Sequence, residues 1–288
     1  MKKLLTGCLL LLCICSMSQK KSSLKWMKLF NGKDLKNWTI KIKDHPINEN
    51  FGNTFRVENG VLKVSYDEYD GFKEQYGHIF YKKKFSAYLL VVEYRFVGEQ
   101  VKGGPGWAIR NSGAMLQSPA PETMALNQDF PISLECQLLG GNGSSKRSTA
   151  NLCTPGTNVE MNGKLFTPHC IDSKSKTYHG YQWVRAEALV LGDSVIKHIV
   201  EGDTVLVYNR PQYDGRDSWV KKAGLKDGET IKEGYLSLQS ESHPVEFRKV
   251  ELFNLEPYMK DPKKLQAILQ KLQKENIKQL SNQLIGHR

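Results

Sequence analysis

The feature that most constrains the fold is a series of segments in which apolar and polar residues alternate. They are rich in Val, Ile, Tyr and Phe, and they break at turn sequences such as ENG, GDS, EGD and DGE. The segments are NTFRVENGVLKVS, KKFSAYLLVVEYRFV, WAIRNSGAML, ISLECQLLG, YQWVRAEALVLG, SVIKHIVEGDTVLVYN, GYLSLQSES and VEFRKVELFNL. Alternation with period two indicates strands that bury one face. Residues 19–257 are therefore predicted to form an all-β domain, a two-sheet antiparallel sandwich or jelly roll.

The pattern changes after Pro257. Apolar residues then recur at three- and four-residue steps, which is typical of one amphipathic helix with a Lys-rich outer face. They are Leu265, Ile268, Leu269, Leu272, Leu280 and Leu284. We expect residues 258–288 to form a basic helix packed on the sandwich, or a poorly ordered tail. Binding to a membrane surface is a further alternative for such a helix.

The net charge of +11 is concentrated at the two ends of the chain. Residues 19–36 carry +5 and residues 258–288 another +5, whereas residues 37–257 carry 26 basic and 27 acidic side chains. A protein that binds nucleic acid through its folded body needs basic residues clustered on that body. The charge distribution therefore argues against nucleic acid and suits an uncharged ligand such as a sugar.

The first eighteen residues have the three regions of a secretory signal peptide. Lys2 and Lys3 precede the apolar run LLTGCLLLLCIC, and small residues follow at Ser16 and Ser18. The apolar run is too short for a stable transmembrane span. We expect residues 1–18 to be removed, so that the mature chain begins at Gln19 and is exported to the periplasm or the exterior, with no transmembrane span. A membrane anchor is the alternative.

A lipoprotein is also considered, because LTGC at 5–8 has the letters of a lipidation site. It is not favoured, since this Cys comes before most of the apolar run. The later Cys15 is preceded by the bulky Ile14.

Three cysteines stay in the expected mature chain. Cys136 lies in phase with Leu134 and Leu138, as a buried small apolar residue would. Cys153 and Cys170 are therefore predicted to form a disulfide in an oxidising compartment. A zinc site of Cys153, Cys170 and His169 is the alternative, although the spacing matches no closed zinc motif.

Polar faces of two predicted strands indicate a binding surface. In ISLECQLLGG, Glu135 and Gln137 lie opposite the apolar residues, and in GYLSLQSES the residues Ser237, Gln239 and Glu241 do the same. Carboxylates and amides provide the paired donors and acceptors that sugar hydroxyls need.

Other segments supply further candidate residues. Glu93 and Arg95 lie together on one strand, although they could be a structural ion pair. Trp107, Arg110 and Asn111 follow a Gly-rich turn, and an indole ring can stack on a sugar. His198 lies in phase with apolar neighbours, so that it is either a functional imidazole or a core histidine. His169 and His243 lie in loops and are either sugar-contacting or surface histidines.

The sequence disfavours an ordinary glycosidase. Such enzymes flank the scissile bond with two carboxylates, and sandwich-fold glucanases carry them at short spacing on one strand. Around Glu135 the residues in phase are Ser133 and Gln137, and no second acid follows at two or four residues. Walker, GxSxG, HExxH and dinucleotide-binding motifs are also missing from the sequence.

Three blocks of sequence resemble the DUF1080 family, the 3-keto-disaccharide hydrolases. They are LFNGKDLKNW, then RNSGAMLQ followed by SLECQLLGG, and the closing GYLSLQSESHPVEFRKVEL, and they cover about residues 28–256. The resemblance implies a concanavalin A-like sandwich, export by bacteria, and action on glycosides already oxidised at C3 by a separate dehydrogenase. Lys249 and Cys136 depart from the usual family residues at their positions, but neither lies on the polar face.

A mechanism follows from this resemblance. A C3 ketone acidifies the C2 hydrogen, so that one base can drive elimination of the C1 aglycone, and water then adds to the intermediate. We expect Glu135 or His198 to be the base, with Arg110, Asn111, Gln137 and Gln239 holding hydroxyls or the enolate. No cofactor is required, although a divalent cation on Glu135 and His198 would stabilise the enolate. The other functions that we consider are a non-catalytic glycan-binding module and an ordinary endo-glucanase.

Overall fold

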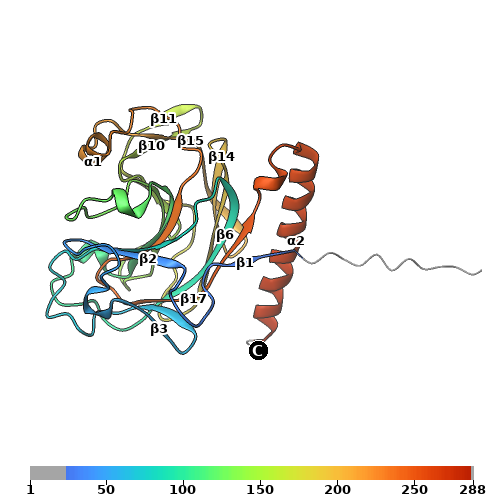
Figure 1. Ribbon diagram of the computed structural model, residues 1–288. Coiled ribbons are helices and arrows are strands. Elements are labelled where there is room, and N and C mark those ends of the chain that lie inside the picture. Colours follow the sequence, from blue (N-terminus) through green and yellow to red (C-terminus); the bar gives the residue numbers. More distant parts are fainter. Residues whose placement is uncertain (1–23, 287–288) are drawn as a thin grey trace, which may run out of the picture.

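The computed structural model describes residues 24–286 and shows a two-sheet sandwich with one long helix against it (Figure 1). Within these residues the strands form two antiparallel sheets, of ten and seven strands. The prediction of an all-β antiparallel sandwich with a C-terminal helix is therefore confirmed. The expected signal peptide, residues 1–18, lies outside the described part of the chain.

The ten-stranded sheet, called the larger sheet, runs from an edge near the middle of the sequence to an edge near its start. Its order is β11 (Lys164–Phe166), β10 (Thr157–Met161), β15 (Asp203–Tyr213), β14 (Val195–Val200), β13 (Val184–Leu191), β6 (Ala87–Phe96), β17 (Val245–Asn254), β4 (Val61–Val64) and β3 (Phe55–Glu58). The short β1 (Met27–Lys28) also pairs with β17, so the first described strand is joined to the last.

The seven-stranded sheet, called the smaller sheet, carries the polar strands singled out above. Its order is β12 (Cys170–Ile171), β9 (Asn151–Cys153), β8 (Leu134–Leu139), β7 (Asn111–Ser118), β16 (Tyr235–Ser240), β5 (Gly77–Tyr81) and β2 (Trp38–Ile42). The two polar strands, β8 and β16, both pair with β7. Their polar faces are therefore brought together from positions about a hundred residues apart.

Short helices occupy the connections, and one long helix follows the sandwich. They are η1 (Phe51–Asn53), η2 (Gly106–Ala108), η3 (Pro121–Thr123), α1 (Ser218–Lys222), η4 (Glu256–Tyr258) and α2 (Pro262–Gly286). Asp261 caps α2, since its Oδ1 accepts from the amides of Lys263 and Lys264. Pro262 at the first position has no amide hydrogen to leave unpaired. No helix among the described residues is long and apolar enough to cross a membrane.

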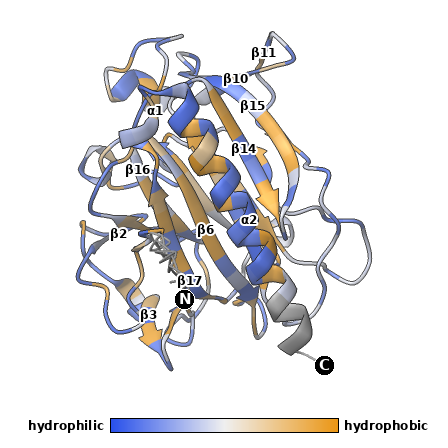
Figure 2. Ribbon diagram, turned by 90° about the vertical axis from the view of Figure 1, so that its right-hand side faces the viewer, coloured by the Kyte–Doolittle hydropathy of each residue, from blue (hydrophilic) through white to orange (hydrophobic). Residues whose placement is uncertain are grey.

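The main core lies between the two sheets. On β8, Leu134, Cys136 and Leu138 are buried in this core, so that Glu135 and Gln137 face away from the larger sheet. A second apolar cluster lies on the other side of the larger sheet, which α2 crosses (Figure 2). It includes Ile268 and Leu272 of α2 and Leu89 of β6. Because α2 covers this outer face, β6 is buried on nearly its whole length.

Candidate active site

The outer face of the smaller sheet holds the carboxylate predicted from the sequence. Glu135 is 7% exposed and projects from β8, and its carboxylate lies over Gly113 of the neighbouring strand. A Cβ added to Gly113 would lie 2.4 Å from Glu135 Oε1. The glycine therefore leaves the space that the carboxylate occupies.

The strand registers continue this polar surface across the sheet. Leu238 pairs with Ala114, which places the next residue, Gln239, beside Gly113. Gln239 pairs with His78, and His78 pairs with Lys41. Directly paired residues lie within contact distance on one face. We call Glu135, Gln137, Gln239, His78 and Lys41 the polar row.

A cavity of about 300 Å³ opens over the Glu135 end of the polar row. Its walls come from β7, β8, β9 and β12 of the smaller sheet and from residues in the connecting segments. The lining residues are Trp107, Asn111, Phe130, Glu135, Gln137, Cys153, Pro155, His169, Cys170 and Glu241. A disulfide joins Cys153 to Cys170 in this wall, next to His169. An apolar and aromatic wall with a few convergent polar groups is the usual form of a small-molecule site.

Two carboxyl groups meet in this cavity. Glu241 follows β16 directly and is 3% exposed. Burial raises the pKa of the Glu135 carboxyl to about 8. Burial, together with the Glu135 charge, raises the pKa of Glu241 well above its usual range. Two like charges cannot both ionise cheaply at short range, so the pair holds at least one proton at neutral pH.

Several buried polar atoms near the pair lack a protein partner. Among the described residues, no hydrogen bond is made by Asn111 Oδ1, Glu241 Oε2, either amide atom of Gln239 or either ring nitrogen of His78. Each such atom costs about 1–3 kcal/mol. Burial lowers the pKa of His78 to about 3, with the nearby Lys41 contributing, so the imidazole is neutral. Because several of these unpartnered atoms lie on one surface, we interpret them as groups that hydrogen-bond to a ligand.

Arg147 holds the loop that carries Trp107. Its Nη1 donates to the carbonyls of Ile109 at 2.6 Å and Gly140 at 2.8 Å, and its Nη2 donates to that of Trp107 at 3.3 Å. The Trp107 ring stacks with Tyr76 at 6.2 Å between centroids and is 55% exposed. An indole held this way offers an open face to a sugar ring.

A second cavity of about 510 Å³ shares Phe130, Pro155 and His169 with the first. It extends toward Asp214, Arg216 and Trp219. The shared wall makes the two cavities parts of one groove, with the carboxyl pair at one end.

The family follows from a match over most of the chain. A family model described as the 3-keto-alpha-glucoside-1,2-lyase-like domain matches residues 25–252. The chain belongs to this family. The resemblance found in the sequence blocks is thereby confirmed, and no curated protein matches the chain.

Solved structures similar to this family member have low sequence identity. A protein of Parabacteroides distasonis provisionally described as a glycosyl hydrolase is 16% identical over 80% of this chain and 100% of its own, with a TM-score of 0.47. The carbohydrate-binding module CBM66 of Bacillus subtilis is 12% identical over 74% and 93%, with a TM-score of 0.42. LamA of Z. galactanivorans, solved with laminaritriose and laminaritetraose, is 11% identical over 80% and 98%, with a TM-score of 0.45.

In this family member five of the residues predicted from the sequence line the groove, and a sixth is buried next to it. Five line the cavity itself, and the sixth, Gln239, lies beside Gly113 in the polar row. The five are Trp107, Asn111, Glu135, Gln137 and His169. Asn151 Nδ2 donates to Gln137 Oε1 at 3.1 Å, which fixes the orientation of that amide.

His198 does not join them. It is fully buried between the sheets, where its Nδ1 lies 3.0 Å from Ala150 O and its Nε2 lies 2.9 Å from Tyr208 Oη. Burial lowers its pKa to about 4. The smaller sheet separates this imidazole from Glu135, because the two side chains lie on opposite faces of it. The role of base or metal ligand predicted for His198 is therefore corrected to that of a hydrogen-bonded core histidine.

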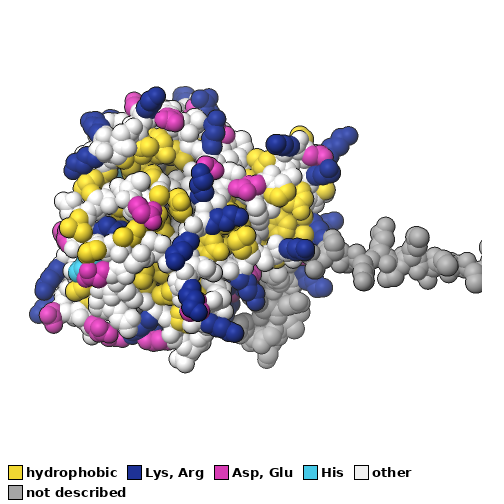
Figure 3. Space-filling model, in the orientation of Figure 1, with side chains coloured by type: hydrophobic (Ala, Val, Ile, Leu, Met, Phe, Trp, Pro, Cys, Tyr) yellow, Lys and Arg dark blue, Asp and Glu magenta, His cyan; other side chains and the backbone are white. Residues whose placement is uncertain are grey.

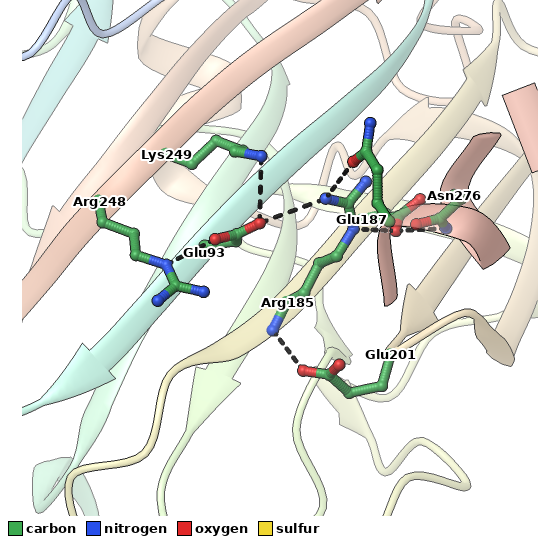
Figure 4. Close-up of polar contacts among 8 residues, drawn as sticks. Glu93, Arg185, Glu187, Glu201, Arg248, Lys249 and Asn276 are labelled. Carbon is green, nitrogen blue, oxygen red and sulfur yellow. Dashed lines mark hydrogen bonds and ion pairs between the residues drawn. The ribbon is translucent and has the colours of Figure 1, made fainter. Parts of the chain in front are cut away.

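Glu93 and Arg95 lie on the outer face of the larger sheet, far from the polar row. Glu93 forms ion pairs with Arg185, Arg248 and Lys249 (Figure 4). Arg95 pairs with Glu246 at 2.7 Å. Both residues therefore form structural ion pairs, although not with each other. The sugar-binding role predicted for them is corrected.

Arg110 and His243 line a different cavity, of about 540 Å³. Arg110 Nη1 donates to Gly180 O at 2.7 Å, and its guanidinium lies 5.6 Å from the Tyr181 ring. His243 is 2% exposed, and burial lowers its pKa to about 4. Neither residue reaches the Glu135 cavity, so their predicted contacts with the same sugar are not found.

Glu135 and His198 cannot share a divalent cation in this arrangement, because one lines the cavity and the other is hydrogen-bonded in the core. Within residues 24–286, no group of three or more His, Cys, Asp or Glu side chains is placed to hold a metal ion. The zinc alternative at Cys153, Cys170 and His169 is also replaced, because the two sulfurs are bonded to each other.

The structure adds three residues that the sequence analysis did not mention, namely His78, Lys41 and Arg147, and gives a specific place to Glu241, which the sequence put on a polar strand face without a role. Glu241 was in phase with Gln239, which is the one signal that could have found it. His78 and Lys41 join the row only through the pairing of β5 with β16 and β2. Arg147 donates to backbone carbonyls, and no sequence pattern indicates which carbonyls an arginine will contact.

Proposed function

We propose that this protein cleaves the glycosidic bond of 3-keto-glycosides by elimination at C1 and C2, followed by hydration. The observation that carries the proposal is the buried Glu135–Glu241 pair, set beside amide and imidazole groups without protein partners. The family description supports the 3-keto substrate. A separate glycoside 3-dehydrogenase would have to supply it.

The chemistry needs one base and one acid. The base removes the C2 hydrogen as a proton, and its bonding electrons form the enolate of the C3 ketone. The enolate then forms the C1–C2 double bond as the C1–O bond breaks, and the acid protonates the leaving oxygen. Water adds its hydroxyl to C1 and a proton returns to C2, so the net reaction is hydrolysis.

The carboxyl pair can supply both groups. Burial and the charge of Glu135 both raise the pKa of Glu241, so we assign the ionised role to Glu135 and the protonated role to Glu241. Ionised Glu135 is then the base and Glu241 the acid. Gln239 and neutral His78 carry free N–H donors beside them, suited to the developing enolate oxygen. Asn111 and Gln137 are placed to bind hydroxyls, and Trp107 to stack on the ring.

Direct hydrolysis is the second candidate, because the pair also provides the two carboxyl groups that were missing on β8. The sequence argument against an ordinary glycosidase considered one strand, whereas Glu241 comes from the end of β16, two strands away. A glycan-binding module without catalysis would use the same wall. The experiment below separates the three functions.

The test offers purified protein a glucoside and the same glucoside oxidised at C3, in D₂O. We expect aglycone release only from the oxidised form, with deuterium incorporated at C2. Glu135→Gln should lower kcat/KM by about 10³-fold or more, because no base remains. Equal release from both substrates, or release without deuterium at C2, would show direct hydrolysis. Binding of sugar with no release would show a binding module.

We also propose that the protein is exported after cleavage before Gln19. The signal-like composition of residues 1–18 supports this proposal. N-terminal sequencing of protein from a secreting bacterial host should begin at Gln19. A chain that retains Met1, or one lipidated at Cys8 or Cys15, would contradict it.

A further inference from the structure

The two basic ends of the chain meet on one face of the molecule. Leu24 and Trp26 pack in the same apolar cluster as Leu265 and Leu269 of α2. Trp26 also contacts Phe253 edge-on, with 5.6 Å between ring centroids. Segments at opposite ends of the sequence therefore lie together over the larger sheet (Figure 1). We call the solvent-facing side of α2, with residues 24–28 beside it and Lys260 and Asp261 directly before it, the α2 face.

We propose that the α2 face docks the protein on an anionic phospholipid surface. Eight lysines and only two acidic residues belong to these segments. The lysines are Lys25, Lys28, Lys260, Lys263, Lys264, Lys271, Lys274 and Lys278, and the acids are Asp261 and Glu275. Lys and Arg side chains stand along the outer edge of α2 in Figure 3. Clusters of four to eight basic residues are typical of surfaces that bind anionic lipid.

The charged network beneath α2 carries equal numbers of acidic and basic side chains. On the larger sheet, Glu93, Glu187 and Glu201 are matched by Arg185, Arg248 and Lys249 (Figure 4). The same network holds the helix. Its members Glu187 and Arg185 contact α2, with Asn276 Nδ2 donating to Glu187 at 2.7 Å and Arg185 donating to Gln279 at 3.4 Å. The apolar face of α2 therefore stays on the sheet, and its lysines stay outward.

The shape of the α2 face suits a bilayer better than a narrow ligand. A helix of 25 residues is about 37 Å long, so the lysines are spread along a straight ridge. Ile277 stands between Lys274 and Lys278 and is 57% exposed, where it can enter the headgroup region.

The position of the chain entry fits the same orientation. The described chain enters at Leu24, which packs in the cluster on this face. The carboxyl pair lies on the outer face of the opposite sheet. A docked molecule would therefore turn its groove away from the lipid and toward dissolved substrate.

Vesicle sedimentation tests the proposal with protein purified from a secreting host. We expect binding to phosphatidylcholine vesicles that contain phosphatidylglycerol, no binding to pure phosphatidylcholine, and loss of binding as salt rises above about 0.15 M. The joint substitution of Lys260, Lys263, Lys274 and Lys278 by Gln should weaken binding roughly tenfold or more. The control replaces four exposed lysines outside the α2 face, namely Lys73, Lys102, Lys146 and Lys164.

Three outcomes would overturn the proposal. They are equal binding to neutral and anionic vesicles, equal loss in both quadruple variants, and binding of the soluble polyanion heparin without any binding to vesicles. The circular dichroism spectrum and thermal midpoint of each variant establish that α2 remains folded. None of these outcomes depends on the catalytic proposal, because no substrate is used.

Discussion

At the scale of single residues, the site depends on what surrounds Glu135 rather than on Glu135 alone. A carboxyl group in water has an ordinary pKa, whereas burial in the groove raises that of Glu135 to about 8. The nearby Glu241 makes the pair share protons, and Gly113 leaves the space in which the Glu135 carboxylate lies. The neighbours thus turn a common side chain into a base that works near neutral pH.

The raised pKa of Glu135 predicts a pH-dependent cost to stability. Between its ordinary pKa of 4.5 and about 8, the folded protein keeps a proton that the unfolded chain releases. Stability attributable to this site therefore falls as pH rises through that window and levels off above it. Glu135→Gln removes the titration, so the variant should be more stable than the wild type at pH 8, by a few kcal/mol at most.

Urea unfolding at pH 5 and pH 8 measures this difference. The gain should be small at the lower pH and should not occur in Glu122→Gln, which changes an exposed carboxylate. A Glu135→Gln variant that gains nothing at pH 8 would show that the folded protein does not raise the pKa of this carboxyl.

Gly113 gives a second prediction at this scale. In Gly113→Ala the new Cβ would lie 2.4 Å from Glu135 Oε1, so the carboxylate must move. We expect kcat/KM to fall about 100-fold, which is the usual cost of an ångström-scale misplacement. Gly106→Ala is the matched control, since its Cβ meets no atom within 4 Å. Similar activity of both variants would mean that Glu135 is not positioned by this contact.

At the scale of elements, α2 stabilises the sandwich through two buried side chains. Ile268 and Leu272 are 9% and 2% exposed, whereas Ile277 on the outer side is 57% exposed. The apolar stripe was predicted from the spacing of these residues. The spacing did not show which sheet α2 covers. The outer faces of β6 and β13 decide this, because Leu89 and Leu189 provide the matching apolar surface.

Leu272→Ala should therefore lower the free energy of unfolding by about 2–5 kcal/mol, because it leaves a cavity between α2 and the larger sheet. Ile277→Ala should change it by less than about 0.5 kcal/mol. Chemical denaturation of both variants provides the comparison. An equal loss in the two would show that α2 does not pack on the sheet as described.

At the scale of the whole molecule, the disulfide joins the stability of the fold to the shape of the groove. Cys153 and Cys170 are 17 residues apart and both line the cavity, next to His169. Replacing both by Ser should cost about 3 kcal/mol of stability, from the entropy of the opened loop. The freed β12 should also raise KM for a glycoside, since His169 loses its support.

Thermal unfolding and steady-state kinetics measure the two effects separately. Cys136→Ser is the control, because this cysteine is buried in the core and forms no disulfide. Loss of stability with an unchanged KM would mean that His169 does not contact the substrate.

The sequence by itself determined the sandwich and the polar faces of β8 and β16 through alternation, and the helix through three- and four-residue spacing, because these patterns depend on neighbours in the sequence. The sequence could not determine that His198 faces the core between the two sheets, whereas His78 belongs to the polar row on the outer face of the smaller sheet. Each imidazole alternates with apolar residues, and only packing decides which face is buried. It also could not find Glu241 as the partner of Glu135, because the pairing of β8 and β16 with β7 joins residues about a hundred positions apart. The carboxyl pair is a product of that long-range pairing, and the α2 face is a product of the packing of residues 24–28 against α2.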